Sequence, residues 1–173
     1  MFHEEYNGNS DNFRVVVDKN NRFFGLFDKK NIRGASLFYR TLAVLVRNKK
    51  KSCVLLYKSQ LSLFDFTFST NHDYDKSSED VIESKSLNLF GEKPLQIMEI
   101  GTIEPEGDRI SNFTTFFEIY YPDSFLRNAI RQDIFSLQDN AEFINLCRFY
   151  PQDIAPLLRK TALALYKLDQ NTN

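Results

Sequence analysis

Cysteine and histidine are scarce in this sequence of 173 residues. The two cysteines, Cys53 and Cys147, lie far apart and form no Cys-x-x-Cys motif, and only His3 and His72 could join them as metal ligands. Structural zinc sites take about four such ligands at characteristic spacings, so a zinc site is not expected. Both cysteines lie in apolar segments, which predicts two buried, reduced thiols in a cytoplasmic protein.

Long apolar runs and an excess of one charge are also missing. No apolar run approaches the length of a membrane span, and the polar, acidic residues 1–12 do not read as a signal peptide. Lysine and arginine number 22 against 23 acidic residues, which argues against general nucleic-acid binding. The sequence has no glycine-rich phosphate loop and no Gly-x-Ser-x-Gly motif, so the enzyme classes built on them have no support.

Short apolar segments separated by polar turns make up most of the chain. Residues 13–17 and 22–27 flank the turn residues Asp18 to Asn21, a pattern that predicts an N-terminal β-hairpin. A charged turn at 47–52 separates two further apolar runs. Beyond the hairpin, strands are predicted over residues 37–46, 53–57, 64–68, 95–103, 112–121 and 142–149.

Two helices are predicted among these strands. The first covers residues 79–90, with an N-cap at Ser77 or Ser78 and a C-cap at Gly91. The second begins at Pro151 and runs to about residue 168. Residues 123–136 are predicted to mix a helical turn with loop, and polar loops are predicted around Gly34 and over 104–109. Residues 1–12 are expected to be a frayed tail, and residues 13–169 a single domain.

The order of these elements, together with several motifs, resembles the Nudix family, in particular the branch related to isopentenyl-diphosphate isomerase. The motifs are "VVVDKNNRFFG", "LFYRTLAVLVRNKKKSCVLLYKS", "FDFTFST", "EIGTIEPEGDRISNFTTFFEIYYPDSF" and "AEFINLCRFYPQDI". They follow the family's order from residue 15 to residue 154. The resemblance implies an α+β fold, an α/β/α sandwich with a mixed sheet and an extra N-terminal β-hairpin.

The residues that carry Nudix chemistry are nevertheless largely missing. In the family, glutamates of the box GX5EX7REUXEEXGU, where U is bulky and aliphatic, bind Mg²⁺ ions that activate water. Aligned from Phe64, the first glycine of the box falls on Thr70, its carboxylate positions fall on Lys76, Lys85, Asn88 and Leu89, and its arginine falls on Ser84. Only the final glycine is kept, as Gly91. No catalytic residue is therefore predicted.

Other carboxylates are candidates for a replaced site, although Asp73 and Asp75 in the loop before the helix are more typical of capping or turn chemistry than of metal binding. Glu79 and Glu83 are four residues apart and share a helix face, so they are weak candidates for a relocated metal site. Glu142 matches a glutamate that many Nudix enzymes use from the closing segment, but Asn145 stands at that motif's next acidic position. An isomerase site is not expected either, because Tyr39 stands where that branch has a histidine.

Basic residues remain as candidates for a ligand pocket. The resemblance places Arg40 and Lys58 at cleft-facing positions, and Lys76 and Lys85 would replace metal ions as partners of phosphates. The leading hypothesis is a Nudix-like domain that has lost Mg-dependent hydrolysis and binds a nucleotide, a diphosphate ligand or a protein, with no cofactor. The alternative is a divergent Mg-dependent hydrolase of nucleoside diphosphate derivatives. A homodimer is compatible with either hypothesis.

Overall fold

A computed structural model describes residues 13–28, 30, 37–73, 75–105, 112–129 and 134–165, without the side chains of 127–129 and 165. Five expectations from the sequence lie partly or wholly outside these residues. They are the tail at 1–12, the connector around Gly34, most of the 104–109 loop, part of the mixed turn and loop over 123–136, and the end of the last helix beyond residue 165.

The N-terminal hairpin forms as the sequence predicts. Strands β1 (Phe13–Val17) and β2 (Phe23–Asp28) pair antiparallel. The carboxylate of Asp18 accepts hydrogen bonds from the backbone N–H groups of Asn20 and Arg22, and Asn21 adopts a left-handed φ of 60°. Asparagine tolerates this conformation better than most residues, which explains the turn at this point.

One long strand, β3 (Phe38–Arg47), lies at the centre of a mixed sheet. Along one edge it runs parallel to β8 (Asn112–Tyr120), from Tyr39 opposite Asn112 to Arg47 opposite Tyr120. Its other edge is shared in turn by β1, by β6 (Phe68–Asn71) and by β4 (Cys53–Lys58). Strand β7 (Gln96–Ile103) pairs with β8, whereas β5 (Leu63–Asp65) and β9 (Phe135–Gln138) pair with β4.

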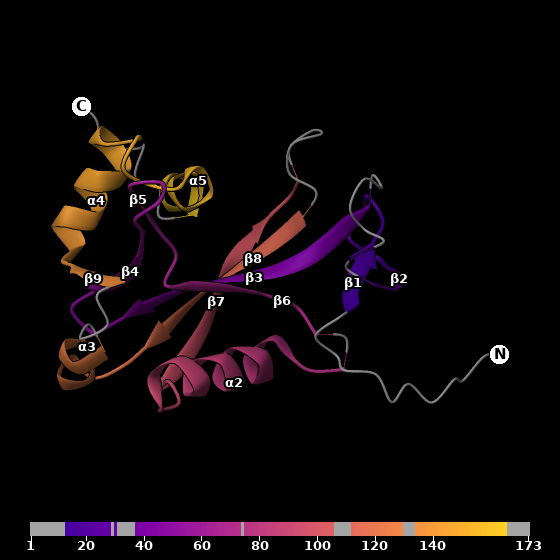
Figure 1. Ribbon diagram of the computed structural model, residues 1–173, viewed down its shortest axis with the longest axis horizontal. Coiled ribbons are helices and arrows are strands. Elements are labelled where there is room, and N and C mark those ends of the chain that lie inside the picture. Colours follow the sequence, from indigo (N-terminus) through magenta and orange to yellow (C-terminus); the bar gives the residue numbers. More distant parts are fainter. Residues whose placement is uncertain are drawn as a thin grey trace.

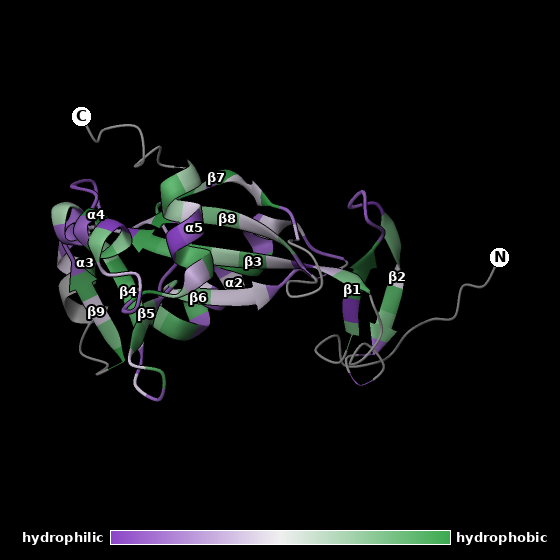
Figure 2. Ribbon diagram, turned by 90° about the horizontal axis from the view of Figure 1, so that it is seen from above, coloured by the Kyte–Doolittle hydropathy of each residue, from purple (hydrophilic) through white to green (hydrophobic). Residues whose placement is uncertain are grey.

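Helices cover both faces of this sheet (Figure 1). Helix α2 (Ser78–Phe90) and the short α3 (Asp123–Ala129) pack on one face, and α4 (Asn140–Phe149) and α5 (Pro156–Leu165) pack on the other. Because side chains alternate along a strand, Leu42 and Val44 of β3 join the core under α2, whereas Ala43 and Leu45 join the core under α4 and α5. The β1–β2 hairpin lies at the opposite end of the molecule from α3 and α4 (Figure 2). The structure therefore confirms the predicted α/β/α sandwich with a mixed sheet.

The first predicted helix is confirmed together with its caps. The Ser77 hydroxyl accepts a hydrogen bond from the backbone N–H of Asp80, and Gly91 ends α2 with a left-handed φ of 75°. A residue with a Cβ is strained at that φ, so glycine is the suitable residue at this C-cap.

The predicted strand over residues 142–149 is wrong, because this segment is helix α4. Asp139 caps the helix by accepting from the N–H of Glu142, and the Glu142 carboxylate accepts from the N–H of Asp139, which completes a capping box. Phe143 and Cys147, four residues apart, are the buried residues of α4. This is a helical spacing rather than the alternation of a strand.

Two other boundaries differ from the prediction for reasons visible in the hydrogen bonds. Residues 64–68 are split between β5 and β6, because the Thr67 hydroxyl accepts from the N–H of Val46 and donates to the carbonyl of Val54, so that a side chain bridges β3 and β4. The last helix begins at Pro156 instead of Pro151. Ahead of it, Phe64 exchanges backbone hydrogen bonds with Asp153 and Ala155, which holds this segment extended beside β5.

Strand β9 was not predicted as a strand. Its residues pair with Cys53 to Leu56 of β4, far away in the sequence.

Within the residues described above, no helix is both long and apolar enough to cross a membrane.

Candidate functional site

A cavity of about 540 Å³ opens on the α5 face of the sheet, beside the first turn of that helix. Its floor consists of β3 residues that point to this face and of the start of β8. Its sides come from β6 and α5, with one residue each from β1 and α2. Small-molecule sites commonly measure roughly 300–1,000 Å³, so this cleft has the size of a ligand pocket.

The floor of the cleft is polar. Thr41 of β3 and Thr114 of β8 are directly opposite each other in the parallel register, and their hydroxyl oxygens lie 2.9 Å apart. The side-chain amide of Asn112 donates to both, over 2.8 Å to Thr41 and 2.9 Å to Thr114. Thr114 is only 2% exposed, so this hydroxyl–amide cluster is held rigidly in the sheet.

Two cations and one carboxylate line the same cleft. The guanidinium of Arg14 lies 4.7 Å from the centre of the Tyr39 ring, an arrangement that holds the cation by its attraction to the ring face. Lys85 reaches the cleft from α2. The carboxylate, Asp65, forms an ion pair with Lys58. The charge left for a ligand is therefore positive, which favours an anion.

The positions of the Nudix box can now be located in space. Thr70 and Lys85, which stand at the first glycine and at one carboxylate of the box, both line the cleft. Lys76 lies outside it, on the surface, where its ammonium is 3.2 Å from the carboxylate of Asp73. Leu89 packs against the hydrophobic core under α2. An ammonium and an apolar side chain thus occupy places where Mg²⁺ would need carboxylate oxygens.

The carboxylates predicted as weak metal candidates do not meet at the cleft. Glu83 pairs with Lys93 at 2.6 Å, and the Glu83 carboxylate raises the pKa of that lysine. Neither Glu83 nor Glu79 lines the cleft. Across the described part of the chain, no three or more histidine, cysteine, aspartate or glutamate side chains come together as a metal site. The donor set of the described residues does not fit the Mg²⁺ ions of a Nudix enzyme.

Two further candidates have structural partners away from the cleft. Arg40 is on the opposite face of β3, where it donates to the side chain and the carbonyl of Asn21 over 2.8 and 2.6 Å. Burial, followed by the charge of Arg40, lowers the pKa of the nearby His72. Glu142 is engaged in the capping box of α4 with Asp139. Of the five predicted pocket residues, only Lys85 lines the cleft. Lys58 is not part of the lining, but it forms an ion pair with Asp65, which is.

Most of the residues that build the cleft were not predicted from the sequence. These are Arg14, Tyr39, Thr41, Asn112 and Thr114, from three different strands. A partial signal was available, since Tyr39 and Thr41 alternate with residues of the opposite face. The parallel pairing that brings β8 beside β3 joins segments about 70 residues apart, and no local pattern reveals it.

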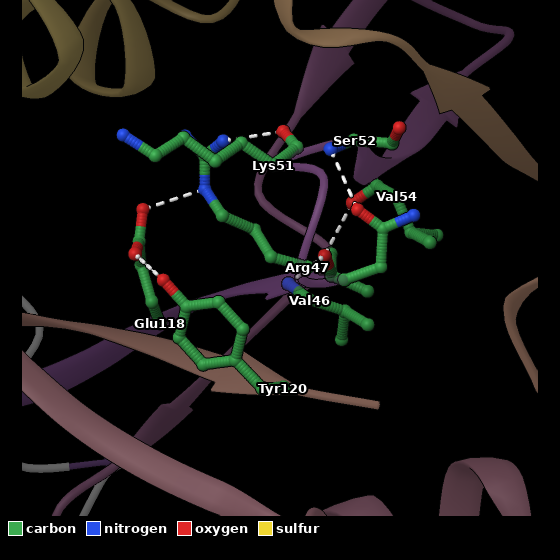
Figure 3. A network of polar contacts seen from close by, with 9 residues as sticks. Val46, Arg47, Lys51, Ser52, Val54, Glu118 and Tyr120 are labelled. Atoms are coloured by element: carbon green, nitrogen blue, oxygen red, sulfur yellow. Dashed lines mark hydrogen bonds and ion pairs between the residues drawn. The ribbon is translucent and has the colours of Figure 1, made fainter. Parts of the chain in front are cut away.

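A second polar cluster lies at the other end of β3, where buried side chains contact one another (Figure 3). The Nε of Arg47 is 2.5 Å from an oxygen of Glu118, and the two side chains are 4% and 6% exposed. Arg47 also donates to the carbonyl of Lys51 and lies over the ring of Phe143, while the Tyr120 hydroxyl donates to Glu118. Burial, and then this carboxylate, raise the pKa of Tyr120 to about 12. The cluster ties β3 to β8 and α4, and we assign it a structural role.

The two cysteines are buried, as the sequence predicts. Burial raises the pKa of both Cys53 and Cys147 to about 12. Neither thiol is therefore a nucleophile at neutral pH, since the reactive form is the thiolate.

A mixed sheet between two helical layers, with a ligand-sized polar cleft over its central strand, defines an α/β/α sandwich protein. No protein-family model matches the sequence. No curated protein matches it either. Solved structures do match. The crystal structure of DR0079 from Deinococcus radiodurans has a TM-score of 0.67 at 11% identity, covering 89% of this chain and 99% of that one. A solution structure of DR0079 describes it as a hypothetical Nudix protein and covers 95% of this chain and 100% of that one, with a TM-score of 0.53 at 11% identity.

Two further solved structures share part of the fold. A mutT/nudix family protein from Listeria innocua has a TM-score of 0.53 at 13% identity, covering 61% of this chain and 81% of that one. NrtR of Shewanella oneidensis has a TM-score of 0.50 at 14% identity, covering 61% and 54%, and has also been solved with a 27mer DNA. Identities this low establish the fold alone. The chain has the Nudix fold, as its motifs suggested.

Proposed function

We propose that this Nudix-fold chain binds a diphosphate-bearing ligand of the nucleotide kind in the cleft beside α5, without a divalent cation. The observation that supports the proposal most strongly is the position of Lys85. It stands at a carboxylate position of the Nudix box, and it lines the cleft together with Arg14. In this proposal, ammonium and guanidinium groups neutralise the phosphates that metal ions neutralise in the enzymes of the family.

Among the described residues no group of three or more carboxylate, histidine or cysteine side chains could hold a metal ion, and this favours binding over hydrolysis. Hydrolysis in the family depends on metal-activated water. The carboxylates that would hold such ions are replaced at Lys76, Lys85 and Leu89, and Glu83 is paired with Lys93. In this proposal the cleft supplies the size and the positive charge for an anionic ligand, and its one carboxylate, Asp65, is paired with Lys58.

Calorimetric titration of ADP-ribose and of inorganic diphosphate, each in EDTA and in Mg²⁺, tests the proposal. We expect binding in EDTA at least as tight as in Mg²⁺. Lys85→Ala and Arg14→Ala should each weaken it about tenfold, because a charge-assisted contact contributes about 1.5–3 kcal/mol and solvent screens part of it. Lys76→Ala is the matched control, because Lys76 is an exposed lysine outside the cleft. It should leave affinity unchanged.

Other outcomes of the same titration would contradict the proposal. Binding only in Mg²⁺, with phosphate-ester products and a dependence on Glu79 or Glu83, would establish the divergent hydrolase instead. The absence of heat with either ligand, in both buffers, would refute nucleotide or diphosphate binding. A protein-binding role for the fold would then be the remaining hypothesis.

A further inference from the structure

A second cavity, of about 510 Å³, lies between α5 and the segment that follows α4, and we call it the α5 groove. Four of its six lining residues are apolar: Pro151, Pro156, Leu163 and Ala164. Pro156 also lines the cleft, so the two cavities are neighbours that share one wall. The volume of the α5 groove lies within the range of ligand pockets, and it can hold an apolar side chain of a partner.

The other two residues of the α5 groove are cationic. They are Arg159 and Lys160, and none of the six lining residues is acidic. The Nε of Arg159 donates to the carbonyl of Cys147 over 2.9 Å, which holds the guanidinium against the end of α4. This bond uses one of the five N–H groups of a guanidinium. Among the described residues Arg159 forms no ion pair with a carboxylate, so the charge of the groove is complementary to an anionic partner.

Exposed aromatic side chains stand next to the α5 groove in the chain. Phe149 and Tyr150, directly before Pro151, are 64% and 51% exposed. Aromatic residues and arginine are enriched in protein interfaces, and exposed apolar patches mark interaction sites. A small anion would contact the groove alone, whereas a peptide segment also covers aromatic side chains beside it. The surface therefore favours a peptide over a small molecule.

We infer that the α5 groove binds an acidic peptide segment of a partner protein, with one apolar anchor side chain between its carboxylates. The anchor packs between the prolines and Leu163, and a neighbouring carboxylate pairs with Arg159. Pairs of guanidinium and carboxylate are charge-assisted and frequently bidentate, so they give direction as well as affinity. This inference does not depend on the proposed function, because the cations of the cleft, Arg14 and Lys85, do not line the α5 groove.

Fluorescence polarisation with labelled eight-residue peptides tests the inference on the full chain. The first probe has a phenylalanine flanked by glutamates, the second has serine in place of the phenylalanine, and the third has lysines in place of the glutamates. We expect the first probe to bind at least tenfold more tightly than either of the others, because the second lacks the anchor and the third lacks the charge. Raising the salt concentration should weaken binding of the first probe, because salt screens exposed charges.

Two variants examine the charge of the α5 groove. Arg159→Gln keeps a donor for the carbonyl of Cys147 but removes the charge, and it should weaken the first probe about tenfold. Ala164→Asp places a carboxylate at an exposed position of the groove, so it should weaken the first probe at least as much without disturbing the core. Ala164→Ser is its neutral control, and Lys50→Gln removes one charge from a side chain that is 79% exposed and lies outside the groove. Both controls should change the affinity less than about twofold.

Several results would overturn the inference. Equal affinities for the three probes, or no binding of the first, would refute recognition of an acidic peptide with an apolar anchor. Equal losses in Arg159→Gln and Lys50→Gln would show an effect of net charge rather than of the groove. A loss in Lys85→Ala with none in Arg159→Gln would place the peptide in the cleft. Titration of inorganic diphosphate keeps the two sites apart, because Ala164→Asp should leave its affinity unchanged.

Discussion

Replacing Glu118 with alanine is expected to destabilise the fold strongly, although Glu118 lies outside the cleft. The substitution leaves the guanidinium of Arg47 without its carboxylate, in a place where that side chain is only 4% exposed. It also removes the acceptor of the Tyr120 hydroxyl. Breaking a buried ion pair from one side costs about 3–5 kcal/mol, because the remaining charge stays buried and uncompensated.

The size of this loss makes it easy to measure. For a domain of this length, each kcal/mol corresponds to roughly 2–4 °C in melting temperature, so we expect a decrease of about 10 °C. Urea unfolding followed by circular dichroism gives the free energy directly, and an unchanged slope against denaturant would confirm that both proteins unfold in the same way. Glu118→Gln keeps the shape and an acceptor for Tyr120. Its loss of stability should still be most of that in Glu118→Ala, because the charge of Arg47 remains buried without a carboxylate.

A double variant separates burial of charge from loss of packing. In Arg47→Met with Glu118→Leu both charges are gone and the volume is kept, so the pair should be less destabilised than Glu118→Ala alone. A loss below about 1 kcal/mol in Glu118→Ala would refute the reasoning, since it would mean that water reaches Arg47 in solution. Strict additivity of the two single changes would refute it as well, because it would mean that the two side chains do not interact.

Two further predictions concern α4 and the alkaline limit of stability. Asp139→Ala removes the N-cap of α4 and one half of its capping box, so it should lower the free energy of unfolding in urea by about 1 kcal/mol. Asp139→Ser keeps a capping oxygen and should recover most of that loss. Equal losses in both variants would contradict the capping role. Burial raises the pKa of both Tyr120 and Tyr121 from 10 to about 12, so the folded chain holds these protons more tightly than the unfolded chain. Their contribution to stability is complete below pH 10 and is lost as the pH rises from 10 to 12. The check is a pH titration that follows phenolate absorbance, together with the melting temperature at each pH. If all eight tyrosines of the folded chain ionised with midpoints near pH 10, the prediction would be contradicted.

Local sequence determined those elements whose signals are themselves local. The hairpin turn needed only Asp18 and Asn21, and α2 needed only a serine cap before it and Gly91 after it. The same kind of local signal was present for α4, in the Asp139 and Glu142 capping pair and in the helical spacing of Phe143 and Cys147. The strand predicted over residues 142–149 therefore conflicts with a local helix signal that the sequence itself contains.

The residue types at the Nudix box positions show what can be predicted about metal binding from sequence alone. Reading Lys76, Lys85 and Leu89 at carboxylate positions was enough to predict that Mg²⁺ would lack its ligands, because ligand chemistry depends on residue type. The strands and helices decide which basic residues face a common cleft. No local sequence pattern reveals this arrangement. Arg40 was expected in the cleft and lies on the opposite face of β3, whereas Arg14 was not considered and lines it.

Only the tertiary structure decided the cleft floor. Thr41 and Thr114 become neighbours because β3 and β8 pair in parallel, and parallel strands are joined by long connections that leave no local trace of their register. Arg14 comes from the hairpin and Lys85 from a helix that packs on the other face of the sheet. The sequence by itself thus determined elements with local signals, such as the N-terminal hairpin and α2, through short-range propensities, and its residue chemistry predicts that Mg²⁺ would lack ligands in the box. The assembly of a polar, positively charged cleft from strands and helices that are far apart in the sequence required long-range pairing.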